Sequence, residues 1–186
     1  MIFSLIMFLF MVLAMIVQVM LPSISFAYGA HIYLLPTMFY VLALAVPYPV
    51  MLLFALLTGV AWDAGHHVYP GGADADLTFG FSVVTFALLG TFIQGIRPLF
   101  RRGRWELPVL MIGLAVLIQL VTEYLLINFR RGGFIFPAEN WFKMVSTSGI
   151  AMLIAPILLV VISQIARKCG YQLEIEQFMF RKVYGH

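Results

Sequence analysis

Long apolar stretches occupy most of this 186-residue chain and strongly limit what it can fold into. A helix rises about 1.5 Å per residue, so roughly 20 apolar residues cross a hydrocarbon core of about 30 Å. Hydrophobic residues make up 63% of the chain and charged residues only 10%, which excludes an ordinary soluble domain. The sequence predicts an all-α membrane protein whose residues 1–166 form a bundle of six transmembrane helices. The predicted spans are residues 2–21, 28–46, 48–62, 77–96, 107–129 and 144–166.

The second and third spans are separated only by Pro47-Tyr48-Pro49, and the third is short. Because proline interrupts a helix, this pattern predicts a tight helical hairpin. Tryptophan placement agrees with the predicted boundaries, since the indole ring prefers the headgroup zone and each tryptophan lies at a predicted helix end. The three are Trp62, Trp105 and Trp141.

Basic residues are distributed unevenly between the two sides of the predicted bundle. One side carries those after the fourth and sixth spans, namely Arg97, Arg101, Arg102, Arg104, Arg167, Lys168, Arg181 and Lys182. The opposite side carries only Arg130, Arg131 and Lys143. The positive-inside rule then places both termini in the cytoplasm, makes the four arginines after the fourth span membrane anchors, and makes residues 167–186 a short basic tail. A net charge of +3 in such segments favours anionic lipid and gives no indication of nucleic-acid binding.

The first span has an alternative interpretation as a signal peptide. Ser25-Phe26-Ala27 follows the apolar run and resembles a small-residue cleavage site. However, no Lys or Arg precedes the run, and the run is longer than a typical signal-peptide core. We therefore expect residues 2–21 to remain as a helix, with cleavage near Ala27 as the alternative.

Small residues form one face of the third span. Ala55, Gly59 and Asp63 recur every four residues, so they share a helix face. A small-xxx-small pattern such as Ala55 and Gly59 lets another backbone approach closely, which predicts helix packing there. Asp63 ends this face at the predicted outer boundary. It is expected to be either a solvated helix-end carboxylate or a structural or partner-contacting group within the bundle.

Polar side chains also share a face of the fifth span. Gln119, Thr122, Glu123 and Arg130 return near the same angle around the helix. A carboxylate facing lipid is unfavourable, so Glu123 is expected to point into the bundle or into a partner. The expected role is an ion pair in which Arg130 snorkels back toward Glu123 and stabilises packing. A partner contact, or a ligand or proton role, is the alternative.

The outer loop after the third span raises the question of a metal site. It contains imidazole and carboxylate groups, which are common metal ligands. Adjacent histidines project in divergent directions, however, and no HExxH or paired-Cys motif is present, so we expect a solvated connector. Ser146-Thr147-Ser148 has no nucleophile-elbow context, and no phosphate-binding loop is present. No catalytic residue, cofactor or metal ligand is predicted; the loop groups considered were Asp63, His66, His67, Asp74 and Asp76.

Three short segments carry a resemblance to a known family. They are Gly59-Val60-Ala61-Trp62-Asp63 closing the third span, Leu77-Thr78-Phe79-Gly80-Phe81-Ser82 opening the fourth, and Arg97-Pro98-Leu99-Phe100-Arg101-Arg102 after it. In these segments, its size and its six-span layout, the chain resembles MreD, the family of rod shape-determining membrane proteins. The His66-His67 pair and the length of residues 71–76 depart from the short outer loop of that family.

The resemblance implies a non-enzymatic scaffold in the bacterial cytoplasmic (inner) membrane that belongs to the cell-elongation complex and maintains cell shape. It implies contact with an MreC-like membrane protein and indirect links to MreB filaments and the peptidoglycan glycosyltransferase and transpeptidase. In size and helix count the family in turn resembles the substrate-binding subunits of energy-coupling-factor vitamin transporters.

Two alternatives from other functional classes remain. A vitamin-type transporter subunit would use an outward pocket near Glu123 and Asp63 for a cationic molecule. Its usual Ala-x-x-x-Ala docking face on the first helix is missing, because Gln18 follows Ala14 four residues on. An intramembrane enzyme or proton-coupled carrier would use Glu123, but the chain lacks a second ionisable group at mid-membrane.

Overall fold

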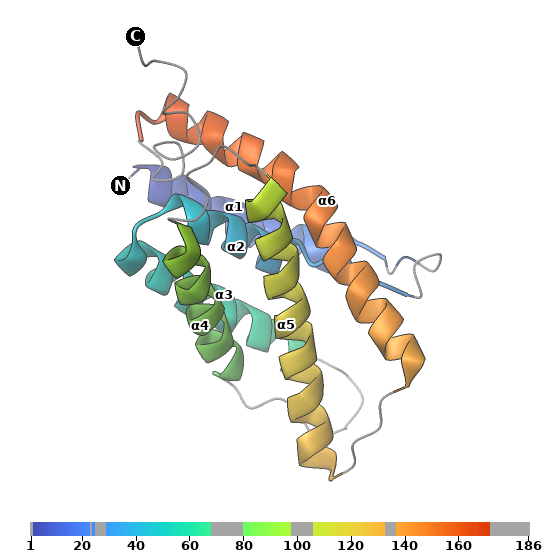
Figure 1. Cartoon of the computed structure of the whole chain (residues 1–186). Helices are drawn as coiled ribbons and strands as arrows, with labels where there is room; N and C mark the ends of the chain where they lie inside the picture. Colours follow the sequence, from blue (N-terminus) through green and yellow to red (C-terminus); the bar gives the residue numbers. More distant parts are fainter. Residues whose placement is uncertain are drawn as a thin grey trace.

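The chain folds into an all-helical bundle (Figure 1). The structure is a computed structural model and describes residues 2–22, 24, 29–67, 80–97, 106–132 and 137–171. In that part of the chain an isolated bridge between Ile24 and Ala30 is the only extended pairing, which confirms the predicted all-α class. The helices are α1 (Ile2–Met20), α2 (Leu34–Ala45), α3 (Tyr48–His67), α4 (Phe81–Ile96), α5 (Glu106–Arg131) and α6 (Ala138–Lys168).

Four of these helices, α1, α3, α5 and α6, are long and apolar enough to cross a membrane, as expected of a membrane protein. The other two are apolar but shorter, with 12 residues in α2 and 16 in α4. At about 1.5 Å per residue, α2 is only about 18 Å long. The prediction of helix from residue 28 onward was wrong for residues 29–33, which precede α2 without forming a helix.

Helix α2 lies at the centre of the bundle. It packs against each of the other five helices (Figure 1). Every residue from Leu35 to Ala45 is buried. A helix that is apolar on all sides is expected in such a place. Helix α1 differs, because only the stripe Phe3, Met7, Met11 and Ala14 is buried while the rest of its surface exposes large apolar side chains. Those side chains suit contact with lipid.

The N-terminus of α2 is capped by a side chain from α1. Gln18 Oε1 accepts a hydrogen bond of 2.9 Å from the Leu35 backbone N–H. The first N–H groups of a helix have no partner within it, and hydrocarbon offers no water to replace one. Gln18 therefore stabilises the central helix.

The C-terminus of α2 is capped from α4. Gln94 Nε2 donates to the carbonyl oxygens of Ala43 and Val46, each at 3.0 Å, and the Arg97 guanidinium donates to the same two oxygens. A cation at a helix C-terminus also complements the helix dipole. The prediction that Arg97 is a cytoplasmic anchor was wrong: its side chain is 7% exposed and is directed into the bundle. Arg101, Arg102 and Arg104 lie outside the described residues.

Helix α3 extends further than predicted. It follows α2 after only Val46 and Pro47 and runs to His67, so Asp63 lies one turn inside the helix. The predicted loop therefore begins later than residue 63. The side chains of His66 and His67, together with Asp74 and Asp76, lie outside the description.

The tryptophans divide into two kinds. The prediction of a headgroup location was wrong for Trp62, which is 2% exposed and packs edge-on against the rings of Tyr33 and Phe86, with centroids 5.0 and 6.3 Å away. Trp141 is exposed in the first turn of α6, which begins six residues earlier than predicted and continues through Pro156. Trp105 lies outside the described residues.

The helices alternate in direction, which gives the bundle two ends. At one end Asp63 of α3 meets the start of α4, and Tyr124 of α5 meets Asn140 of α6; we call this the Asp63 end. At the other, the Arg97 end, the C-termini of α2 and α4 meet, and the ring of Phe3 stacks on Tyr171 at 4.4 Å.

Candidate functional site

Helices α3 and α4 form the most extensive contact in the bundle. A Cβ atom added to Gly59 would lie 2.4 Å from the Cα atom of Val83, so only glycine allows this approach. Ala55, one turn earlier on the same face, is fully buried. One turn later, Asp63 Oδ2 accepts a hydrogen bond of 2.6 Å from the Gly80 N–H. We call Gly59, Asp63, Gly80 and Val83 the α3–α4 clasp.

The chemistry of the clasp explains its residue types. Gly80 is the N-cap of α4 and has a φ of +94°, a left-handed conformation that other residues adopt at a cost of roughly 1–2 kcal/mol. A carboxylate next to a helix N-terminus accepts from its N–H groups and complements the helix dipole. Asp63 is 1% exposed, so the alternative of a solvated helix-end carboxylate was wrong.

A chain of polar side chains crosses from α2 to α5. The Tyr40 hydroxyl donates to Gln119 Oε1 at 2.8 Å, and Gln119 Nε2 donates to Glu123 Oε1 at 3.0 Å. All three side chains are buried. Trp62 and Asp63 of α3 are also close enough to act on the Glu123 carboxyl group. Glu123 therefore points into the bundle, next to the α3–α4 clasp.

Arg130 is not brought into this cluster. It is exposed in the last turn of α5, and the groups that act on the Glu123 carboxyl group are Gln119, Trp62 and Asp63. The expected ion pair between Arg130 and Glu123 is thus replaced by a hydrogen bond to an amide. Thr122, predicted on the same face, donates to the backbone carbonyl of Ile118 instead.

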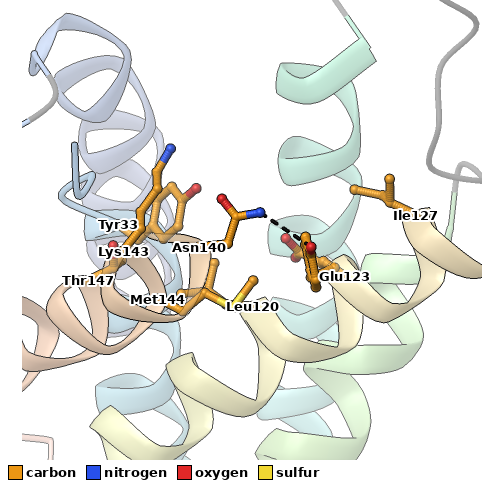
Figure 2. A pocket seen from close by; sticks show the side chains of 9 residues that line it. Tyr33, Leu120, Glu123, Ile127, Asn140, Lys143, Met144 and Thr147 are labelled. Atoms are coloured by element: carbon orange, nitrogen blue, oxygen red, sulfur yellow. Dashed lines mark hydrogen bonds between the residues drawn. The ribbon is translucent and has the colours of Figure 1, made fainter. Parts of the chain in front are cut away.

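A cavity of about 280 Å³ opens beside Glu123 between α5 and α6. Figure 2 shows the α6 side chains of Asn140, Lys143 and Thr147 around it, with Glu123 on the opposite wall. Asn140 Nδ2 donates to the Tyr124 hydroxyl at 3.3 Å, which joins the two helices at the Asp63 end. The remaining lining residues are Tyr33, Leu120, Tyr124, Ile127 and Met144.

Further along, α5 and α6 pack closely. Ser148 Oγ donates to the Gly113 carbonyl oxygen at 2.8 Å, and a Cβ atom on Gly113 would lie 2.3 Å from the side chain of Met152. The hydroxyl of Ser148 is thus used in helix packing. The α5–α6 pair is closed at its middle and hollow toward the Asp63 end.

The described residues contain no cluster suited to a metal ion, because no three His, Cys, Asp or Glu side chains among them lie close enough together to hold one. The side chains of His66 and His67, and residues Asp74 and Asp76, are not among those that the structure describes. The chemistry that the described site offers is a buried carboxylate, an amine and several neutral hydrogen-bonding groups around a small cavity.

Sequence reasoning missed several of these residues. Tyr40 and Gln94 each interrupt an apolar span, and a polar group within such a span needs a partner, so that signal was available. Lys143 and Asn140 give no such signal, because both precede the apolar run of residues 144–166 and polar residues are ordinary in a connector.

No known family model, curated protein or solved structure matches this chain.

Proposed function

We propose that this chain is a non-enzymatic scaffold of the bacterial cell-elongation complex, resembling MreD, that links an MreC-like protein to MreB filaments and lateral peptidoglycan synthases. One observation carries the proposal. Gly59, Asp63 and Gly80, three of the residues on which the resemblance rests, meet in the α3–α4 clasp. A pattern of separated residues in the sequence therefore corresponds to one packing unit.

In this proposal all six helices cross the inner membrane and both termini are cytoplasmic. Two features support that topology. The start of α1 meets Tyr171, three residues after the end of α6, through the stacked rings of Phe3 and Tyr171, and the C-terminus of α4 lies at the same end. In the sequence, α4 is followed by the basic residues Arg101, Arg102 and Arg104. The Asp63 end then faces the periplasm. A reporter that works only in the cytoplasm should be active when it is fused after His186. Activity of a reporter that works only in the periplasm would mean that the chain has one membrane span fewer than proposed.

Asp63 and Glu123, the residues that the sequence suggested for a partner contact, do not form the partner surface. Asp63 and Glu123 are 1% and 8% exposed, so they are poorly placed to contact another protein directly. Exposed aromatic side chains lie nearby at the Asp63 end, and aromatic residues are enriched in interfaces. They are Phe129 in the last turn of α5 and Trp141 and Phe142 in the first turns of α6. We assign the MreC-like contact to this aromatic rim.

Co-purification and cell shape test the proposal together. The unsubstituted chain should capture an MreC-like protein, and cells lacking the chain should become round. Phe142→Ala should weaken capture, whereas Leu153→Ala, at an even more exposed apolar position in the middle of α6, should not. Rod-shaped cells without the chain, together with no captured MreC-like protein, would refute the scaffold role.

A second candidate function is the substrate-binding subunit of a vitamin-type transporter. The cavity beside Glu123 is the observation that favours it. Its volume falls slightly below the range of about 300–1,000 Å³ for pockets that hold drug-sized ligands. Capture of an ATPase module, or a vitamin-like molecule retained through purification, would favour this function over the scaffold.

A further inference from the structure

The cavity between α5 and α6 is lined by an acidic and a basic side chain that do not pair. Glu123 lines one wall and Lys143 another. Among the described residues, no hydrogen bond or ion pair joins Lys143 to a neighbour. In Figure 2 the Lys143 side chain extends away from Glu123, with Asn140 lying between them. The cavity thus presents an ammonium group and a carboxylate at separate points.

Among the described residues, the buried Glu123 carboxyl group has no cationic partner. The groups acting on Glu123 are two neutral side chains and another acid, Asp63. An ionised carboxylate in a medium of low dielectric is costly unless it is paired, so a cationic group in the cavity would be strongly favoured. A primary ammonium would also donate hydrogen bonds to Glu123.

Depth along the helices places Lys143 nearer the membrane surface than Glu123. Lys143 lies five residues after the start of α6, and Glu123 lies eight residues before the end of α5. At about 1.5 Å per residue these positions are about 8 Å and about 12 Å from the Asp63 end. Trp141, exposed one half-turn before Lys143, suits the headgroup zone. A headgroup could therefore meet Lys143 first and reach Glu123 below it.

We propose that this cavity binds a phosphoethanolamine group, with its phosphate at Lys143 and its primary amine at Glu123. A lysine ammonium is a common partner for phosphate, and the small volume suits a short, polar, zwitterionic group. The source is either the headgroup of phosphatidylethanolamine or a soluble phosphoethanolamine ester. The site is independent of the scaffold role, because it needs no protein partner.

Lipid competition tests the proposal on the unsubstituted protein. The detergent-purified chain is mixed with equal amounts of phosphatidylethanolamine, phosphatidylglycerol and phosphatidylcholine with identical acyl chains, and bound lipid is identified by native mass spectrometry. Phosphatidylethanolamine should be retained preferentially. Phosphatidylglycerol has no amine for Glu123, and the quaternary ammonium of phosphatidylcholine has no N–H to donate. Equal retention of all three lipids would overturn the proposal.

Substitutions test whether the retained lipid binds in this cavity. Glu123→Gln and Lys143→Gln should each weaken retention by about tenfold, the size expected for one charge-assisted contact. Glu139→Gln and Lys168→Gln change exposed residues on α6 and should leave retention unchanged. A preference that survives both cavity substitutions would also overturn the proposal, because the lipid would then bind elsewhere.

A final comparison identifies the source of the group. Displacement of the lipid by millimolar glycerophosphoethanolamine would support the same recognition chemistry with a soluble ester as its ligand. Retention of the lipid in its presence would support a headgroup site that also requires the acyl chains.

Discussion

The α3–α4 and α5–α6 pairs make the two most extensive helix contacts in this bundle, but they differ at the Asp63 end. In α3–α4, Gly59 and Asp63 hold the start of α4 against α3. In α5–α6, close packing at Gly113 and Ser148 gives way to a cavity lined by charged and polar groups. Similar antiparallel pairs can thus serve as a rigid support or as a binding site, depending on whether small residues continue to the end of the contact.

The largest effect should come from filling the α3–α4 clasp. Gly59→Ala places a Cβ atom against the Val83 backbone, which cannot move without shifting α4. We expect a loss of about 3 kcal/mol in the free energy of unfolding, at the upper end of typical overpacking effects. Reversible unfolding in mixed micelles, followed by circular dichroism, measures it. Gly95→Ala is the matched control, since its Cβ atom meets open space; equal stability of the two variants would mean that α4 does not pack on Gly59.

Removing the buried cap of α2 should have the next largest effect. Arg97→Leu removes the charged donor to the carbonyl oxygens of Ala43 and Val46 and leaves Gln94 as their partner. Hydrogen bonds from charged groups contribute about 1.5–3 kcal/mol, so we expect a loss of about 2 kcal/mol in the same unfolding measurement. Arg167→Leu, at an exposed position in the last turn of α6, should cost much less. A similar loss for both variants would argue that Arg97 acts at the surface.

Two substitutions of Asp63 distinguish the contribution of its hydrogen bond from that of its charge in the α3–α4 clasp. Asp63→Ala removes the acceptor for the Gly80 N–H and should cost about 1–2 kcal/mol, as for the loss of a helix cap. Asp63→Asn keeps an acceptor oxygen and should recover most of that loss. If the asparagine variant were as unstable as the alanine variant, the carboxylate charge at the start of α4 would be the main contribution.

The smallest effect on stability is expected in the α5–α6 pair, beside the cavity. Glu123→Gln can still accept from Gln119 Nε2, so we expect a change of no more than about 1 kcal/mol in the free energy of unfolding. The same variant should retain the lipid about tenfold more weakly, which would separate binding from stability. A loss as large as that of Gly59→Ala would instead make the polar chain from Tyr40 to Glu123 a main support of the bundle.

Composition and apolar runs alone were enough to predict an all-α membrane protein. Four-residue spacing placed Ala55, Gly59 and Asp63 on one face of a helix, because helical periodicity is a local property. Helix lengths were less predictable. An apolar run looks the same whether it faces lipid or is surrounded by other helices, so the sequence could not show that α2 is buried and has only 12 residues.

The tertiary structure alone decided which polar groups meet. Arg97 resembled a surface anchor until its position beside the C-terminus of α2 made it a cap. Asp63 and Gly80 are 17 residues apart, yet one hydrogen bond joins them. Lys143 and Glu123 line one cavity although a connector separates their helices. Sequence spacing predicts neighbours on one helix, but contacts between helices depend on how their faces pack in three dimensions.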